Sequence, residues 1–537
     1  MNSGRTALQL GVSLVANSHN SAFQLAANAT FSYNFSLGRQ RSFRKDVARP
    51  VFVTDGSMNN PRSIPLHSGR SSIVQGNLLD FPDDPVACMR RLQQQCGDLA
   101  VLEDNGQRLA FVFSPEFNRE VLSNTSTYHA QFFSLRGSRR SAQRRVTSGL
   151  LSMNGAEHRD SRRIMMDVFA KRILPAYHET ICSLTDELLA DWQDGQEHDL
   201  NVEMVHFMLR MTTALLFGID DAEYAVELGG RIDRWVRQNH KVGMGAFVSS
   251  PEFGDLYDEL LQMAEELEVS VQEMFDRHRA VGETNRRSDV LSLMFQAQQS
   301  EHQLSDEKLI GHATLTFGAA HLTTAHTFSW TLFLLAQHPD VMQRLTEELA
   351  TCTSDPYPTF EELSSLPYLD WVIKESMRVL PASSYSTRVT AEATTLGPLS
   401  LPRGTAVIFS QYMTHHRPDL FERPDEFRPE RWQSISPTPY QYLPFGAGPR
   451  MCIGAPLAMM ELRTALAIIL KRFHMQIPAG CTVDGKVVAT MLGPTSTVPA
   501  NLIGADQIAE TVPVHGSIHN LIDLPPAAVP ASQRRAA

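Results

Sequence analysis

One cysteine in the C-terminal part of the chain has the surroundings of a metal ligand. Cys452 lies between glycines, with Arg450 two residues before it. A cysteine binds metal as a thiolate, so its surroundings must favour negative charge. The residues from 455 to about 471 predict a helix with Pro456 in its first turn, so the sulfur precedes a helix N-terminus, where N–H groups favour an anion. These surroundings predict that Cys452 is an activated thiolate, suited to bind a metal.

Two other interpretations of this loop were weighed against the metal site. A cysteine beside a glycine turn is often a buried structural residue, since free cysteine is among the most buried residue types. The run from Gly446 also begins like the dinucleotide-binding pattern GxGxxG. That pattern requires a preceding strand and a third glycine, but here no strand is predicted and Met451 occupies the last position. The dinucleotide interpretation is rejected.

The loop resembles the haem-binding signature of the cytochrome P450 family, F-x-x-G-x-R-x-C-x-G. The five matching positions are Phe445, Gly448, Arg450, Cys452 and Gly454. The resemblance implies that Cys452 is the axial thiolate, that Phe445 shields the sulfur and that Arg450 pairs with a haem propionate. A thiolate ligand pushes electron density onto the iron and favours O–O cleavage.

Four further residues match family positions that contact the haem propionates. His158 and Arg162 are four residues apart in a predicted helix, so they share one helix face. Arg388 and His416 match propionate contacts of soluble members. Without the cysteine loop, the segment around His158 reads as an exposed charged turn.

The segment from Ser305 to about Gln337 predicts a long buried helix. Ser305 is a good N-cap, and acidic residues follow it in the first turn. The segment is apolar nearly all round, as in a helix buried on every side. At 1.5 Å per residue it is about 50 Å long, enough to cross a whole domain.

The middle of this helix resembles the family pattern A-G-x-[D/E]-T-T but departs from it at two positions. Ala320 replaces the glycine, and Leu322 stands where the acid belongs. Thr323 and Thr324 match, so the resemblance makes them the catalytic candidates, with Thr323 handling protons during oxygen activation. The alternative is that Thr323 only bonds back to a helix carbonyl, as buried threonines do.

Two other groups of residues follow from the resemblance. Glu375 and Arg378 share a helix face and, with Arg431, resemble the family's E-x-x-R and P-E-R-F residues, which form a structural ion network. The residues expected to line the substrate pocket are Ala319, Ala320, Ser384, Tyr385 and Leu492.

Composition limits the partners and the compartment. Lys and Arg total 48 against 59 Asp and Glu, a net charge of −11, which argues against a general nucleic-acid surface. The 6 cysteines are scattered without zinc spacing, which favours a reducing compartment and a cytoplasmic location. No apolar run reaches the length of a transmembrane helix.

The chain divides into three parts. Residues 1–60 lack acidic residues as far as Lys45 and predict a disordered extension, a targeting segment or a true start at Met58. The P450-like domain is expected over 61–503, with helices throughout 174–299 and a strand from Val407 to Tyr412. A disordered tail is expected over 504–537.

The resemblance as a whole implies a mainly α cytochrome P450 fold, in which haem b lies between the long central helix and the cysteine loop beside a small β-rich region. The implied activity is insertion of one atom of O₂ into an apolar substrate, with electrons from a separate ferredoxin or flavoprotein. Because Leu322 replaces the acid, peroxide-driven or non-hydroxylating chemistry is an alternative. A haem protein that senses a ligand without turnover is a second alternative.

Overall fold

The protein is described by a computed structural model. It covers residues 72–526, apart from 133–134, 171, 220, 246–250, 281–288, 300–303, 355–356 and 508. The predicted N-terminal extension over 1–60 lies outside the described residues, as do residues 61–71 of the predicted domain.

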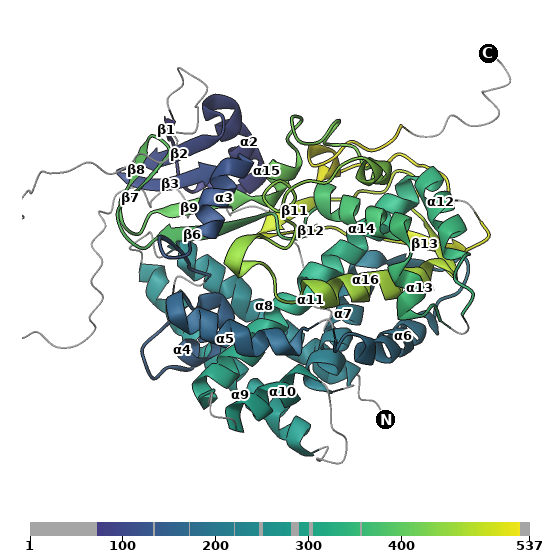
Figure 1. Cartoon of the computed structure of the whole chain (residues 1–537), viewed down its shortest axis with the longest axis horizontal. Helices are drawn as coiled ribbons and strands as arrows, with labels where there is room; N and C mark the ends of the chain where they lie inside the picture. Colours follow the sequence, from purple (N-terminus) through teal and green to yellow (C-terminus); the bar gives the residue numbers. More distant parts are fainter. Residues whose placement is uncertain are drawn as a thin grey trace, which may run out of the picture.

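Helices form most of the described chain, and the main sheet lies at one end of them (Figure 1). The α-helices are α1 (Asp80–Asp83), α2 (Pro85–Cys96), α3 (Pro115–Ser123), α4 (Ala142–Val146), α5 (Gly155–Val168), α6 (Pro175–Leu189), α7 (Leu200–Phe217), α8 (Ala222–Gly245), α9 (Pro251–Ala280), α10 (Val290–Gln299), α11 (Asp306–Gln337), α12 (Pro339–Leu349), α13 (Phe360–Ser364), α14 (Pro367–Val379), α15 (Gln411–His415) and α16 (Ala455–Leu470). Short 3₁₀ helices are η1 (Leu150–Ser152), η2 (Pro429–Gln433), η3 (Gly448–Arg450) and η4 (Ser517–Asn520).

The strands form one larger and three small sheets. The larger sheet has the order β1 (Ile73–Gln75), β2 (Leu99–Asp104), β3 (Gln107–Val112), β9 (Ala406–Ser410), β6 (Tyr385–Thr390) and β4 (Tyr128–Ala130). The small sheets join β10 (Phe473–Gln476), β13 (Pro499–Gly504) and β5 (Glu197–Asp199); β11 (Gly485–Val488) and β12 (Met491–Pro494); and β7 (Thr394–Leu396) and β8 (Leu399–Leu401). Strand β6 of the larger sheet carries Arg388.

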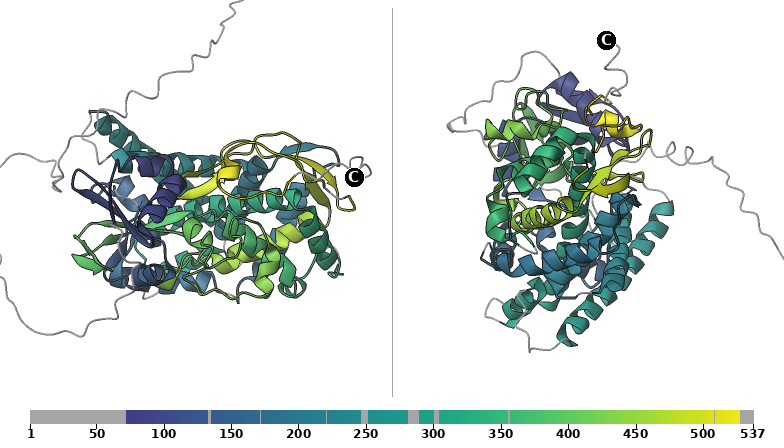
Figure 2. Two further views of the ribbon diagram at one scale, coloured as in Figure 1. Left: turned by 90° about the horizontal axis from the view of Figure 1, so that it is seen from above. Right: turned by 90° about the vertical axis from the view of Figure 1, so that its right-hand side faces the viewer.

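Helix α11 is the central element of the helical part. It contacts α7, α8, α14 and α16, and the views in Figures 1 and 2 place it between neighbouring helices. The Ser305 side chain accepts a hydrogen bond from the Lys308 N–H, which fixes the helix start. Most of its side chains are buried, as expected for a sequence that is apolar nearly all round. The predicted long buried helix is therefore confirmed.

Two predicted boundaries differ from the structure. The strand expected to reach Tyr412 ends at Ser410, because the Ser410 hydroxyl accepts from the Met413 N–H and caps α15. The stretch 174–299 is mostly helical, but it contains the short strand β5, which pairs with β13. That pairing joins distant segments, so local periodicity could not reveal it.

The C-terminal segment is a correction to the sequence prediction. Residues 505–526, except 508, pack onto the domain instead of forming a disordered tail, whereas residues 527–537 of the predicted tail lie outside the described residues. Ile518, Leu521 and Ile522 belong to the main hydrophobic core. The Tyr412 hydroxyl donates to the Leu521 carbonyl over 2.6 Å, so the folded domain extends past residue 503.

No single helix in the described residues is long and apolar enough to span a membrane. The bent pair formed by residues 200–217 and 222–243 passes the same length and composition test jointly.

Candidate functional site: a thiolate loop facing a buried cationic cavity

The cysteine loop presents Cys452 to a large internal cavity. The Cys452 N–H donates to the Phe445 carbonyl over 2.8 Å, which closes the loop just before α16. Burial raises the pKa of the Cys452 thiol, whereas the N–H groups of Gly454 and Ala455 and the charge of Arg162 lower that pKa. The sulfur therefore has the helix N-terminal donors that the sequence predicted, and the exposed Cys452 lines the cavity.

Gly448 shapes the same loop. Its φ is +72°, in the left-handed region that side chains rarely adopt. A Cβ at this position would lie 2.5 Å from the Leu122 carbonyl oxygen, so the loop packs directly against the end of α3. The positive φ and this close contact explain why the signature position is occupied by a glycine in this chain.

The cavity has a volume of about 2290 Å³ and lies between α11, the cysteine loop, α5 and strand β6. Pockets for a single small ligand usually measure about 300–1,000 Å³, so this one has room for a cofactor and a substrate. Apolar residues form much of its wall, including Phe81, Leu109 and Leu315.

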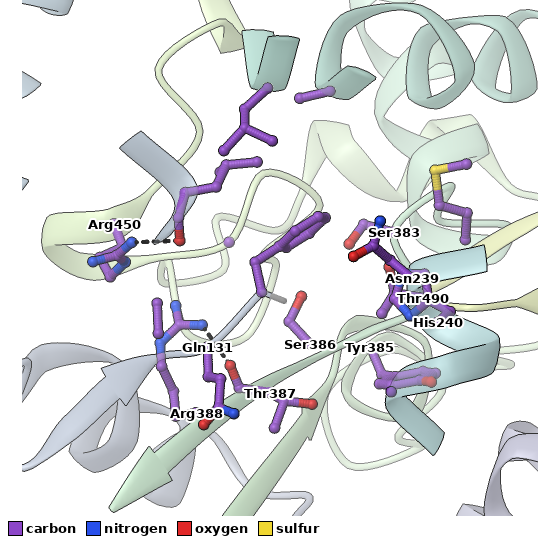
Figure 3. Close-up of a pocket in the computed structure, with 18 of the residues that line it drawn as sticks. Gln131, Asn239, His240, Ser383, Tyr385, Ser386, Thr387, Arg388, Arg450 and Thr490 are labelled. Atoms are coloured by element: carbon purple, nitrogen blue, oxygen red, sulfur yellow. Dashed lines mark hydrogen bonds between the residues drawn. The ribbon is translucent and has the colours of Figure 1, made fainter. Parts of the chain in front are cut away.

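Positive side chains gather at one end of this cavity. Arg162, Arg388 and Arg450 all line it, together with His158. Figure 3 shows Arg388 and Arg450 at the same end, away from Ser383 and His240. Burial and the mutual repulsion of Arg388 and Arg450 lower the pKa of Arg388 to about 10. Burial and the nearby arginines also lower the pKa of His158 to about 4.

These cations have carbonyl partners but no acidic ones. Arg450 donates to the carbonyls of Met153, Leu150 and Leu151, and Arg162 donates to the carbonyl of Met451 over 2.8 Å. The Arg388 guanidinium donates to the Thr387 carbonyl over 3.0 Å. Within the described residues no carboxylate pairs with any of the three. Half-buried charges are favoured by an opposite charge nearby, so the cavity end is suited to receive an anionic group.

The residues of this cavity fit a haem. A porphyrin carries two carboxylates, which match the unpaired arginines, and an apolar ring, which matches the walls. Among the described residues no cluster of three or more His, Cys, Asp or Glu could hold a metal ion. Cys452 would hold the iron of such a group through its thiolate.

The α11 residues predicted for catalysis face the cavity. Ala319, Ala320, Thr323 and Thr324 all line it. The Thr323 hydroxyl donates to the Ala319 carbonyl over 3.0 Å, and Thr324 donates to Ala320 over 3.2 Å. The back-bond that was the alternative interpretation of Thr323 is thus present in the structure. It leaves the hydroxyl oxygen free to accept a hydrogen bond from the cavity side.

Leu322, which replaces the acid of the family pattern, does not line the cavity. An acid from another helix lies near the same turn of α11. Asp233 of α8 contacts the buried His321, with 3.2 Å between Oδ1 and Nε2. The other ring nitrogen of His321 lies 2.9 Å from the Phe317 carbonyl.

The predicted ion network is assembled beside the cysteine loop. Glu375 accepts from Arg378 at 2.9 and 3.1 Å and from Arg431 at 2.8 Å. Arg378 also donates to the carbonyls of His415, Pro424 and Glu426. Together with Glu375, these acceptors satisfy the hydrogen-bond donors of its guanidinium. Glu375 and Arg378 are both fully buried. The network ties α14 to the loop that precedes the cysteine.

His416 is a correction to the predicted propionate contacts. It does not line the cavity; its ring stacks on Tyr412 with centroids 4.0 Å apart. Its Nδ1 lies 2.8 Å from the Tyr412 carbonyl, and Nε2 lies 3.8 Å from the Asp425 carboxylate. The end of α15 turns the ring toward α2 and the ion network, so this histidine is structural.

Two predicted pocket residues also point elsewhere. Tyr385 lines the cavity, but the neighbouring Ser384 is fully buried and does not line it. Leu492 is fully buried in the core, and its carbonyl accepts from the Trp330 indole. Met491 and Ser383 occupy the cavity wall instead.

Sequence reasoning missed two residues that serve this region. Trp432 donates its indole N–H to Glu375 over 2.9 Å, and a tryptophan directly after Arg431 could have signalled this. Glu461 of α16 lines the cavity, and burial raises its pKa to about 8. An acid inside a strongly apolar helix was its sequence signal.

Comparison with known proteins agrees with this geometry. The family model described as Cytochrome P450 matches residues 67–493. The chain is 29% identical over 399 residues to the cyclooctat-9-en-7-ol 5-monooxygenase of Streptomyces melanosporofaciens, covering 72% of this chain and 84% of that protein. It is 36% identical over 222 residues to cytochrome P450 3A29 of Sus scrofa, covering 38% of this chain and 44% of that protein.

A solved structure gives the same fold. Retinoic acid-bound cyanobacterial CYP120A1 superposes with a TM-score of 0.68 at 22% identity, covering 79% of this chain and 96% of that one. The mainly α architecture is therefore the P450 fold. With the thiolate loop, the cavity arginines and a family match over most of its length, this chain belongs to the cytochrome P450 family of haem-thiolate monooxygenases.

Proposed function

We propose that this enzyme holds haem b and inserts one atom of O₂ into a largely apolar small molecule, with electrons from a separate ferredoxin or flavoprotein. The observation that carries the proposal is the meeting of Cys452 with three unpaired arginines in one apolar-walled cavity. The scattered cysteines favour a cytoplasmic enzyme.

The residues of the chain have separable roles in this proposal. Cys452 ligates the iron, while Arg162, Arg388 and Arg450, with His158, hold the propionates. When bound, the haem-thiolate supplies the cleavage of O₂. The Thr323 hydroxyl accepts and passes protons at the cavity wall, because its oxygen retains a free acceptor site beside its bond to Ala319.

The substrate is proposed from the cavity and from one relative. The relative named cyclooctat-9-en-7-ol 5-monooxygenase has an alcohol in its name, and the wall of this cavity is mainly apolar. A largely apolar small molecule is therefore the proposed substrate class. The comparisons give no support to peroxide-driven or ligand-sensing alternatives.

Turnover under ¹⁸O₂ tests the proposal. Purified enzyme, NAD(P)H, a ferredoxin and its reductase should convert an apolar substrate to a product with one ¹⁸O atom. Thr323→Val should lower product per NAD(P)H about tenfold or more and raise peroxide release. Product that carries no ¹⁸O, or that forms only with added peroxide, contradicts the proposal.

A further inference from the structure

His312 of α11 is a buried polar residue with no described partner. His312 is one of the residues that line the cavity, and 1% of the residue is exposed. Neither Nδ1 nor Nε2 has a hydrogen-bond partner in the described part of the chain. A buried unpaired polar group costs about 1–3 kcal/mol, and native proteins nearly always supply a partner. We infer that the missing hydrogen-bond partner of the His312 ring is an atom of a molecule that enters the cavity.

His312 lies on the same face of α11 as the threonine proposed to handle protons. His312, Thr316, Ala319 and Thr323 all line the cavity, at the spacing of one helix face. His312 precedes Thr323 by about three turns, which is roughly 16 Å along the helix. A molecule that contacts both ends of this face is therefore long.

The backbone around His312 is held in place by a close contact between two segments. A Cβ at Gly311 would lie 2.5 Å from the Ser148 carbonyl carbon, and a Cβ at Gly149 would lie 2.3 Å from the Gly311 carbonyl oxygen. Two backbones touch at this crossing, so α11 cannot slide there without a clash. A shift of α11 is therefore not expected to bring the His312 ring to a hydrogen-bond partner within the protein.

The charge state of His312 limits what it can bind. Burial and the nearby Lys308 lower its pKa to about 4, so the ring is neutral at physiological pH. A neutral imidazole offers one N–H donor and one bare nitrogen acceptor. A hydroxyl group can pair with either atom. Arg136 also lines the cavity, and its Nε has no partner in the described residues, so a carboxylate at Arg136 is the rival ligand.

We propose that His312 binds a hydroxyl group at one end of a long, otherwise apolar substrate whose other end is oxidised beside Thr323. This inference rests on the proposed monooxygenase function and adds the substrate's polar end and its position. The substrate is then an alcohol before it reaches this enzyme, and oxidation takes place at the end remote from the hydroxyl.

Binding of matched probes to the haem-loaded enzyme tests the inference. The probes are tetradecanol, farnesol and geranylgeraniol, each with its methyl ether and its carboxylic acid, and calorimetry measures affinity without turnover. At least one alcohol should bind about tenfold tighter than its ether, the worth of one buried hydrogen bond. Turnover of that alcohol should place the new oxygen at the remote end.

Three variants assign the preference to His312. His312→Phe keeps a ring but should reduce the alcohol-to-ether ratio to about one. His312→Gln keeps a donor and an acceptor and should retain part of the preference. Thr314→Val is the matched control, because its hydroxyl bonds to the Ile310 carbonyl and does not line the cavity, so the ratio should stay unchanged.

Three results overturn the inference. They are the absence of any alcohol preference in the wild-type enzyme, an unchanged preference in His312→Phe, and tightest binding of an acid that is insensitive to His312→Phe. The last result assigns the polar end to Arg136. Failure of the proposed function is visible separately, as loss of ¹⁸O product by the wild-type enzyme with every substrate.

Discussion

Gly448 carries the tightest geometric constraint in the cysteine loop. Gly448→Ala adds left-handed strain and a contact 2.5 Å from the Leu122 carbonyl. Gly480→Ala is a matched control, because Gly480 has a φ of +74° but nothing within 4 Å of its Cβ. The control should lose about 1–2 kcal/mol of unfolding free energy. Gly448→Ala should lose about 1–3 kcal/mol more and load less haem, as measured by urea unfolding and haem absorbance. Equal losses contradict this account.

Glu461 makes stability depend on pH. Its folded pKa of about 8 lies above the reference value of 4.5, so the buried carboxyl is neutral in the folded protein at neutral pH. The stability that this raised pKa contributes to the folded protein is fully present below pH 4.5 and is lost as pH rises through about 8. Glu461→Gln keeps the shape and cannot ionise, so its melting temperature relative to wild type should rise across that window. Parallel pH curves for the two proteins would refute the assignment.

At the scale of elements, the ion network couples α14 to the segment before the cysteine loop. Glu375→Gln removes the charge that pairs Arg378 and Arg431, leaving two buried cations without an anion. The expected loss is about 3–5 kcal/mol of unfolding free energy, by chemical denaturation. Arg231→Ala breaks an exposed pair with Glu227 and should cost about 0–1 kcal/mol. Similar losses for both variants would show that the network is not a buried unit.

Elements with strong local signals were predictable from sequence. Helices α11 and α16 follow from apolar periodicity and from capping or N-terminal proline signals, and both match their predicted ranges closely. Strand β5 was missed because it exists only through its pairing with β13, a contact between distant segments. Local pattern cannot reveal a partner that lies far away in the chain.

The same division holds for the site. The cysteine loop and the arginines were found because their spacing matches a known signature. His416, Ser384 and Leu492 were misplaced because sequence position gives the neighbourhood of a side chain but not its direction. The direction depends on where α15 begins and on the packing that buries Ser384 and Leu492. The unpaired His312 could only be recognised from its surroundings.

At the scale of the whole molecule, the C-terminal segment completes the fold. Ile518 is fully buried, and its segment meets α2 through the bond from Arg90 to the Asn520 carbonyl. Ile518→Ala should cost about 2–5 kcal/mol of unfolding free energy. The exposed Val488→Ala should change it by less than about 0.5 kcal/mol. Truncation after Gly504 should lower the melting temperature further, and an unchanged melting temperature would restore the disordered-tail prediction.

The central claim is that Cys452 is the thiolate ligand of a haem iron. The most direct measurement is the absorption spectrum of the reduced enzyme with carbon monoxide, for wild type and Cys452→Ser. The account predicts the red-shifted Soret band of thiolate-ligated haem in the wild type and its loss in the variant. A wild-type band at the position of histidine-ligated haem, or an unchanged spectrum in Cys452→Ser, would contradict it.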